Sequence, residues 1–222
     1  WMFMGTHAIS QGTLGPTNAP SESMKSLQEI WDRVDAQQDD PRTPISRLPY
    51  TITESGSYYV TGNLSSTGHG IVIETSGVTV DLMGFSLTGD GGYGDYGIYV
   101  DGTTNAVIEN LVIKGGSISG FHFGLRCKYT NNIRIEQMVV SGNTLSGVLL
   151  YGRDGQCNGN TIADCTISGN GDEGVILYGY QGQCNGNTIA DCTISGNGGR
   201  GVLLDGASGQ CNGNIISDCS IN

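Results

Sequence analysis

The chain lacks long apolar runs, an excess of positive charge and, over most of its length, helical periodicity. No run approaches the 18 apolar residues of a membrane-spanning helix, so the sequence predicts no membrane span. Its 10 Lys and Arg stand against 21 Asp and Glu, and the net charge of −11 argues against nucleic acid and anionic membrane surfaces as partners. The same charge disfavours a polyanionic ligand unless calcium bridges the two. The 37 glycines follow no triplet period, which excludes a collagen.

What the sequence does contain is a repeat in its C-terminal part. The segment 156–170 returns almost unchanged as 183–197, and a third copy starts at Gln210. Two series of cysteines keep the same spacing of 27 residues: Cys157, Cys184 and Cys211, and Cys165, Cys192 and Cys219. Each copy holds three short β-branched runs separated by Gly, Asn and Asp, which predicts one coil of a parallel β-helix per repeat. Successive coils would lie about 4.8 Å apart, so that equivalent side chains stack in columns.

The earlier part of the chain keeps this period with less similar residues. Glycines that precede an apolar strand recur in steps of 27, 27, 23, 27 and 27 residues: Gly70, Gly97, Gly124, Gly147, Gly174 and Gly201. The sequence therefore predicts an all-β solenoid of about six to seven coils over residues 41–222. Within it, a ladder that satisfies backbone groups at a bend is expected at Asn160, Asn187 and Asn214. Asn222 falls before the strand that the repeat demands, so the solenoid is expected to be truncated there.

The first 40 residues divide into two parts. Residues 1–22 are predicted to be the remnant of a secretory signal, ending near Ala8-Ile9-Ser10, and a linker rich in Gly, Pro and Ser. Residues 23–40 predict an amphipathic helix with Ser26 and Glu29 as its capping box. Its apolar face consists of Met24, Leu27, Trp31 and Val34. This face would either cap one end of the solenoid or begin an oligomerising coiled coil.

Several short motifs resemble those of a known family. They are Leu48-Pro49-Tyr50-Thr51-Ile52, Gly56-Ser57-Tyr58-Tyr59-Val60, Gly77-Val78-Thr79-Val80-Asp81 and the Asn-x-Ile…Ser-Gly-Asn coils. With them the chain resembles the right-handed parallel β-helix proteins of the pectin-lyase-like superfamily, in particular secreted bacterial β-helix repeat proteins. The resemblance implies a right-handed solenoid and a secreted or cell-surface location. It leaves the activity open, because the superfamily contains lyases, hydrolases, epimerases and non-catalytic surface proteins.

Six of the seven cysteines are periodic, and the seventh is not. Cys127 falls at the inward position that leucine occupies in later coils, at Leu150, Leu177 and Leu204, which predicts a small core residue. In the periodic columns, in-register strands hold Cβ atoms slightly too far apart for a disulfide. Stacked, buried thiols are therefore expected, with disulfides between coils as the alternative. No His accompanies these cysteines, which argues against zinc.

Charged side chains on the outer face of the first strand of each coil are the fallback candidates for catalysis. Alignment back from the repeats gives two outward columns. The first consists of Asp81, Val112, Arg134, Thr161, Thr188 and Ile215. The second consists of Met83, Lys114, Glu136, Ala163, Ala190 and Ser217. A polysaccharide lyase would act at Asp81, Lys114, Arg134 and Glu136, with Arg126 and Lys128 on a neighbouring strand. Such an enzyme needs converging carboxylates for calcium and a base. Acids and bases alternate here, so ion pairs between coils are the favoured interpretation.

Two further features favour structural roles. A column of carboxylates, Asp164, Asp191 and Asp218, would allow a ladder of calcium ions, but solvated turn residues are the simpler interpretation. Gly68-His69-Gly70 resembles a motif of polygalacturonase-like hydrolases. The pair of carboxylates that glycoside hydrolysis requires does not precede it. His69 instead stands at the turn position of Tyr96 and Phe123 in later coils. No cofactor other than calcium is considered.

One feature exceeds what packing of the core requires. The strands Val148-Leu149-Leu150, Val175-Ile176-Leu177 and Val202-Leu203-Leu204 are apolar on both faces. Leu149, Ile176 and Leu203 are therefore predicted to point outward in a stripe, extended by Tyr151, Tyr178 and Tyr180. Something is expected to cover this stripe. The candidates are the N-terminal segment, a sister subunit or another surface protein, and a sugar chain stacked on the tyrosines.

The sequence thus predicts a secreted or cell-surface β-helix that serves as a scaffold or adhesion module without catalysis, and that self-associates or binds carbohydrate. The near-identical repeats favour this interpretation, since a catalytic site needs unlike residues that converge. The alternative is a polysaccharide lyase or another carbohydrate-active enzyme of the same superfamily.

Overall fold

The structure, a computed structural model, describes residues 26–29 and 40–222 and divides the chain into two units, Trp1–Asp40 and Pro41–Asn222. In the first unit, Ser26 and Glu29 form the predicted capping box. The Ser26 N–H donates to Glu29 Oε2 at 2.7 Å, and the Glu29 N–H donates to Ser26 Oγ at 3.1 Å. The expected signal remnant, the linker and most of the helix lie outside the described residues. No described helix is long and apolar enough to cross a membrane.

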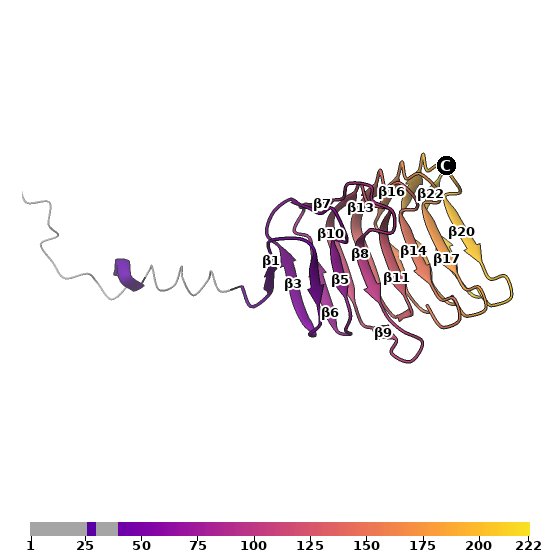
Figure 1. Cartoon of the computed structure of the whole chain (residues 1–222), viewed down its shortest axis with the longest axis horizontal. Coiled ribbons are helices and arrows are strands. Elements are labelled where there is room, and N and C mark those ends of the chain that lie inside the picture. The colour runs from indigo at the N-terminus through magenta and orange to yellow at the C-terminus, as the bar shows by residue number, and fades with distance from the viewer. Residues whose placement is uncertain (1–25, 30–39) are drawn as a thin grey trace, which may run out of the picture. The chain divides into compact units, whose positions relative to one another are not determined.

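The second unit is a parallel β-helix in which two long sheets run from coil to coil, and a third sheet consists of one strand pair (Figure 1). Sheet 1 has 13 strands: β1 (Thr43–Ile45), β3 (Gly56–Val60), β4 (Leu64–Ser65), β6 (Val78–Asp81), β7 (Ser86–Thr88), β10 (Val112–Ser119), β13 (Arg134–Ser141), β15 (Thr161–Ala163), β16 (Thr166–Ser168), β18 (Thr188–Ala190), β19 (Thr193–Ser195), β21 (Ile215–Ser217) and β22 (Ser220–Ile221). Sheet 2 has seven strands: β2 (Tyr50–Ile52), β5 (Ile71–Ile73), β8 (Tyr96–Asp101), β11 (Phe123–Lys128), β14 (Val148–Tyr151), β17 (Val175–Tyr178) and β20 (Val202–Asp205). Sheet 3 pairs β9 (Ile108–Glu109) with β12 (Thr130–Asn131).

Strands of successive coils pair in parallel, which confirms that equivalent side chains stack in columns. Asp81 is an exception to the predicted alignment, since it pairs with Lys114 and not with Val112. Cys127 is in register with Leu150, and Leu150 with Leu177. All three are buried, so Cys127 is the core residue that the sequence predicts. The same alternation places residues 126 and 149 on the outer face of sheet 2, where side chains are not needed for the core.

The turn glycines are required because the backbones of successive coils approach one another closely. A Cβ on Gly174 would lie 2.6 Å from the carbonyl oxygen of Gly201 and 2.5 Å from Cγ2 of Ile194. Gly147 has the equivalent contact with the oxygen of Gly174, at 2.7 Å. The period that these glycines mark is therefore the period of the coil.

Two buried asparagine ladders hold the turns. In the predicted one, the N–H of Asn160 donates to Oδ1 of Asn187 at 2.8 Å, and that of Asn187 donates to Oδ1 of Asn214 at 2.8 Å. A second ladder, which the sequence analysis missed, links Asn143, Asn170 and Asn197. Buried backbone groups at both bends thus find partners in the next coil.

Candidate functional site

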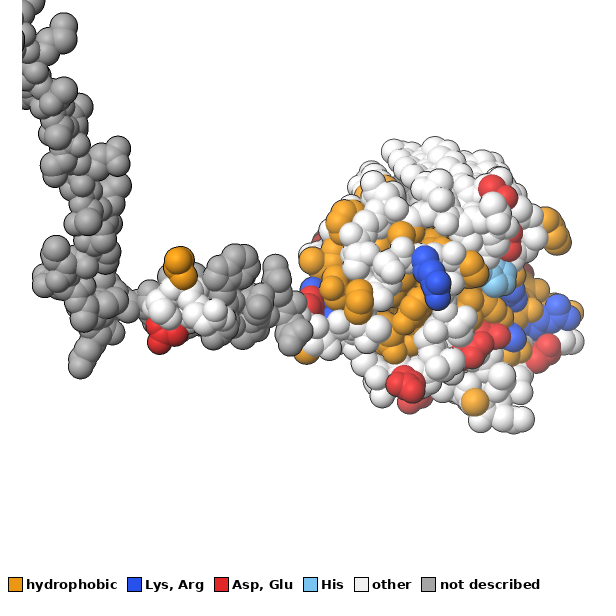
Figure 2. Space-filling model, turned by 60° about the vertical axis from the view of Figure 1, so that its left-hand side comes forward, with side chains coloured by type: hydrophobic (Ala, Val, Ile, Leu, Met, Phe, Trp, Pro, Cys, Tyr) orange, Lys and Arg blue, Asp and Glu red, His pale blue; other side chains and the backbone are white. Residues whose placement is uncertain are grey.

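The outer face of sheet 2 carries a continuous row of rings and guanidinium groups that crosses several coils. We call it the aromatic row, and its members are His69, Tyr93, Tyr96, Tyr99, His122, Phe123, Arg126, Tyr151, Tyr178 and Tyr180. Figure 2 shows histidine atoms bordered by hydrophobic and basic side chains on the solenoid. The row follows from the strand register, because Tyr99, Arg126 and Leu149 occupy one outward column.

At one end of the row, three rings pack against one another in equivalent positions of successive coils. The His69 ring lies 5.1 Å from that of Tyr96, and the Tyr96 ring lies 5.7 Å from that of Phe123. The backbone N–H of Tyr96 donates to Nδ1 of His69 at 3.3 Å. His69 therefore occupies the turn position that the sequence predicts. Its Nδ1 lies 3.4 Å from Oδ1 of Asp95.

Arg126 joins the two halves of the row. Its guanidinium carbon lies 5.2 Å from the ring centre of Tyr96, 5.6 Å from that of Tyr99 and 4.7 Å from that of Tyr151. Its Nη1 also donates to the Tyr96 hydroxyl at 2.6 Å. A guanidinium at these distances is attracted to the ring faces.

The predicted apolar stripe continues the row and forms a groove of about 290 Å³. Leu149 is in register with Ile176, and Ile176 with Leu203, and all three line the groove. Leu149 is only 7% exposed, although it points away from the core, because neighbouring outer side chains cover it. The rest of the lining comes from Phe123, Leu145, Ser146, Tyr151, Arg153, Asp172, Tyr178 and Asp205.

The three predicted tyrosines lie together. The rings of Tyr151 and Tyr178 are stacked at 5.4 Å and 12°, and those of Tyr178 and Tyr180 at 6.1 Å and 22°. Arg153 lies over the Tyr180 ring at 5.4 Å. Burial, and then the charge of Asp205, raise the pKa of Tyr178, so its hydroxyl is a neutral donor at physiological pH.

Carboxylates border the groove and the row. Asp172 lines the groove, and the adjacent Glu173 is 9% exposed. Burial, and then the hydrogen bond with Asp172, raise the pKa of the Glu173 carboxyl, while Arg200, 3.5 Å away, opposes that change. Tyr99 donates to Oδ1 of Asp101 at 2.7 Å, and burial together with this bond raises the pKa of Tyr99.

Unsatisfied polar atoms gather beside the row. Among the described residues, three buried side-chain atoms have no hydrogen-bond partner: Nδ1 of His122, Nε of Arg126 and Oγ of Ser146. His122 and Arg126 belong to the row itself, and Ser146 lines the groove. Such atoms are uncommon in folded proteins, and all three lie on this side of sheet 2, which makes it the candidate site.

The fallback catalytic residues lie on a different face, the outside of sheet 1. Asp81 is in register with Lys114 and Lys114 with Glu136, so Asp81 belongs to the second outward column and not, as predicted, to that of Val112 and Arg134. The turn between β6 and β7 holds two extra residues, because Asp81 and Thr88 are seven residues apart whereas their partners Lys114 and Ser119 are five apart. Asp81 lies 3.4 Å from Arg42 and 3.7 Å from Lys114, and Arg134 contacts Glu136 at 2.6 Å. The charges are thus paired with one another.

The column of Asp164, Asp191 and Asp218 has a backbone explanation. Their φ angles are 53°, 53° and 52°, a left-handed conformation that Asp tolerates better than most residues. Among the described residues, no three His, Cys, Asp or Glu side chains converge to hold a metal ion. The calcium ladder therefore gains no support from this geometry.

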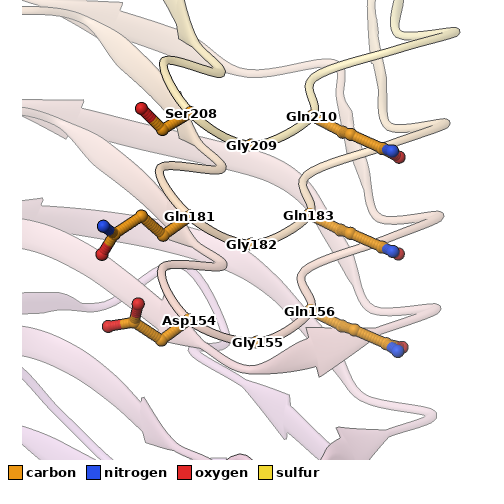
Figure 3. Close-up of a pocket in the computed structure, with 9 residues that line it drawn as sticks. All are labelled: Asp154, Gly155, Gln156, Gln181, Gly182, Gln183, Ser208, Gly209 and Gln210. Atoms are coloured by element: carbon orange, nitrogen blue, oxygen red, sulfur yellow. The ribbon is translucent and has the colours of Figure 1, made fainter.

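A larger cavity, of about 440 Å³, lies at the turn before the cysteine columns. Figure 3 shows Gln156, Gln183 and Gln210 pointing to one side of a glycine floor, opposite the column that begins with Asp154. Oε1 of Gln183 accepts from Asn158 at 3.4 Å, and Oε1 of Gln210 accepts from Asn185 at 3.2 Å. These amides form hydrogen bonds between neighbouring coils, and no aromatic ring lines the cavity. The groove on sheet 2 is therefore the better candidate for a binding site.

The sequence analysis found the tyrosine end of the row and missed the rest. Tyr99 and Arg126 stand two residues after the turn glycines Gly97 and Gly124, as Leu149 does after Gly147. That offset was a usable signal, because it assigns all three to one outward column. Tyr93, which is 93% exposed and lies 4.6 Å from the ring of His122, comes from a loop that no period could place.

Comparisons with known proteins agree with this architecture. No curated protein matches the chain. Among solved structures, it is similar to Geobacillus virus E2 ORF18, at 19% identity with a TM-score of 0.65, and to the A-module of Azotobacter vinelandii mannuronan C-5 epimerase AlgE6, at 20% identity with a TM-score of 0.54. The matches cover 75% and 82% of this chain but 34% and 52% of those chains, so it spans about a third and about half of their lengths. At these identities the likeness concerns the fold alone.

The family comparison covers most of the β-helix. Residues 69–222 match the family described as right handed beta helix region, which also confirms the predicted hand of the solenoid. The chain belongs to the right-handed β-helix family.

Proposed function

We propose that the chain is a non-catalytic, carbohydrate-binding module of a secreted or cell-surface protein, and that an extended polysaccharide lies along the aromatic row. The observation that carries this proposal is the continuity of the row. It runs from His69, before β5, to Tyr178 on β17, which is four coil spacings or about 19 Å. An extended polymer can contact every coil in turn, whereas a compact ligand would use only one or two.

The chemistry of the row suits sugars. Tyrosine offers an apolar ring for the C–H face of a sugar and a hydroxyl for its polar edge. Asp172, Asp205 and Arg153, at the border of the groove, can accept from or donate to sugar hydroxyls. An apolar groove with a few placed polar groups is the usual form of a ligand site.

Self-association through the same stripe is the second candidate. Leu149 is 7% exposed and is already covered within the chain. A stable interface buries about 800 Å² on each partner, which a narrow groove with charged borders does not offer. We therefore rank a sugar chain above a sister subunit. Light scattering tests this order, since Leu149→Asp and Leu203→Asp should leave the mass unchanged.

The lyase alternative has less support. Its carboxylates are engaged in ion pairs with Arg42, Lys114 and Arg134. Incubation with uronate polymers, with and without calcium, should produce no ultraviolet absorbance from unsaturated ends. Turnover that Arg134→Ala abolishes would replace the proposal by the lyase.

The direct test is binding to a glycan array followed by affinity electrophoresis with the polymer that binds. Tyr178→Ala should weaken binding about tenfold, which corresponds to the loss of about 1.4 kcal/mol of ring contact. Tyr59→Ala is the matched control, because Tyr59 is half-buried as Tyr178 is, but it belongs to sheet 1 and packs under Arg42 at 4.7 Å. The proposal fails if no polymer binds, or if both variants lose affinity equally.

A further inference from the structure

Two columns of thiols run along the C-terminal coils, and carbohydrate binding uses neither. Cys157, Cys184 and Cys211 each follow a glutamine that pairs in parallel with its equivalent in the next coil, so the three cysteines stack. Cys165, Cys192 and Cys219 stack in the same way, because the strands that precede them are in register. All six cysteines are free, and the sulfurs of the earlier two coils are buried.

The spacing of the coils suits a metal ion better than a disulfide. Coils of a parallel β-helix repeat about every 4.8 Å, and stacked Cβ atoms keep that separation, whereas a disulfide needs Cβ atoms 3.5–4.5 Å apart. A metal–thiolate bond is about 2.3 Å long, so a linear sulfur–metal–sulfur unit spans about 4.6 Å. Two stacked cysteines are therefore placed to hold one metal ion between them.

Hydrogen bonds distinguish the first column from the second. Nδ2 of Asn160 donates to Sγ of Cys157 at 3.4 Å, and Nδ2 of Asn187 donates to Sγ of Cys184 at 3.4 Å. The Thr130 hydroxyl lies a further 3.2 Å from the sulfur of Cys157. An N–H that points at a sulfur stabilises the charged thiolate, which is the form that binds metal.

In the second column the sulfurs face acceptors. Cys165 Sγ donates to the carbonyl oxygen of Ala163 at 3.1 Å, and Cys192 Sγ donates to that of Ala190 at 3.1 Å. In the first column the closest carbonyl contacts are longer, 3.7 Å for Cys157 and 3.8 Å for Cys184. A nearby carbonyl oxygen favours the protonated thiol, so the second column is the weaker metal ligand.

We propose that Cys157 and Cys184 form a linear, two-coordinate site for a soft monovalent cation, Cu(I). Thiolate sulfur suits soft ions such as Cu(I) and zinc, and two ligands alone argue against zinc, which takes four. On binding, two S–H bonds break, two S–Cu bonds form, two protons leave to solvent and the copper keeps its oxidation state. The remaining negative charge is shared with the amide donors of Asn160 and Asn187. A tetrahedral site is not available, because no three potential ligands converge among the described residues.

The test is an anaerobic titration of the reduced full chain with the acetonitrile complex of Cu(I), in competition with a chromophoric Cu(I) chelator. Native mass spectrometry gives the stoichiometry, and ultraviolet absorbance reports the copper–thiolate bonds. One tightly bound copper is expected. Cys184→Ser should weaken it at least about a hundredfold, because one of only two ligands is lost. Cys157→Thr is the second variant, and it repeats the residue that the preceding coil carries at Thr130, so it is expected to fold.

Matched controls remove a thiol elsewhere. Cys192→Ser takes the middle cysteine of the second column, and Cys127→Ser a buried thiol outside both columns, and each should keep the tight site. The proposal is overturned if Cys184→Ser and Cys157→Thr bind copper as the wild type does, or if Cys192→Ser loses the site as well. It is also overturned if the reduced chain takes up no copper and, in air, loses two mass units as a Cys157–Cys184 disulfide forms.

Discussion

Replacement of Asn170 by Ala should destabilise the solenoid more than any comparable change on its surface. Asn170 is 2% exposed and belongs to the second asparagine ladder. Its Oδ1 accepts from the backbone N–H of Asn143 at 3.2 Å and from Nδ2 of Asn143 at 2.9 Å. Its Nδ2 donates to the carbonyl oxygen of Val140 at 3.2 Å and to Oδ1 of Asn197 at 2.9 Å. The variant removes all four bonds at once.

The magnitude follows from what is left behind. Asn143 is 2% exposed, so its N–H would remain buried without an acceptor, which costs about 1–3 kcal/mol. The lost bonds to Val140 and Asn197 add about 1 kcal/mol. We expect Asn170→Ala to lower the free energy of unfolding by roughly 2–4 kcal/mol, with the lower end applying if a water molecule enters the gap.

Urea unfolding followed by circular dichroism measures this change, and hydrogen exchange of the Asn143 amide locates it. Asn185→Ala is the matched control, because Asn185 belongs to a third, more exposed ladder with Asn158 and Asn212, in which its Oδ1 accepts from the Asn212 N–H at 2.7 Å. Asn212 is exposed, so its N–H can turn to water and the loss should stay under about 1 kcal/mol. Equal losses for the two variants, or unchanged exchange at Asn143, would refute the reasoning.

Two other predictions use the turn and the groove. Gly174→Ala should lower the midpoint of urea unfolding, since the new Cβ would press on Ile194 and on the carbonyl oxygen of Gly201. Gly169→Ala is the control, because the space around its Cβ position is open. Its φ is 63°, so it should cost only the strain of that conformation, about 1 kcal/mol. Glu173 should make the folded state less stable as the pH rises. Its raised pKa means that the folded chain holds this proton more tightly than the unfolded chain, so its contribution is complete below the ordinary pKa of Glu and is lost as the pH passes the raised value. Glu173→Gln should remove that part of the pH dependence above the ordinary pKa of Glu, and parallel wild-type and variant curves would contradict the assignment.

The fold was predictable because the spacing of the turn glycines is kept even where the residues between them differ. The spacing of Cys157 and Cys184 fixes the length of one coil, and the glycines carry that length back to Gly70. Inside and outside then follow from strand alternation, which is why Cys127 and Leu149 were placed correctly on opposite faces. These inferences depend only on the backbone repeat, which holds in every coil of sheet 2.

The candidate site was less predictable, since its position depends on loops. Asp81 was placed two residues out of register because the sequence gives the length of a coil but not which of its turns is lengthened. Tyr93 contacts His122 through a loop of residues 89–95, whose path no pattern specifies. Arg126 was noted as a charge, but its role depends on the rings of two other strands, β8 and β14.

The aromatic row crosses both repeated and unlike coils, and these two parts would contribute differently to ligand binding. Where coils repeat almost unchanged, as from Tyr151 to Tyr178, stacked columns present the same group on each coil and can only add identical contacts. Where coils differ, one outward column passes through Tyr99, Arg126 and Leu149, which offer a hydroxyl, a cation and an apolar surface in turn. Discrimination between ligands requires unlike groups at fixed distances. If the row binds a polysaccharide as proposed, the coils around Arg126 would select the polymer, and the repeated coils would add further contacts along it.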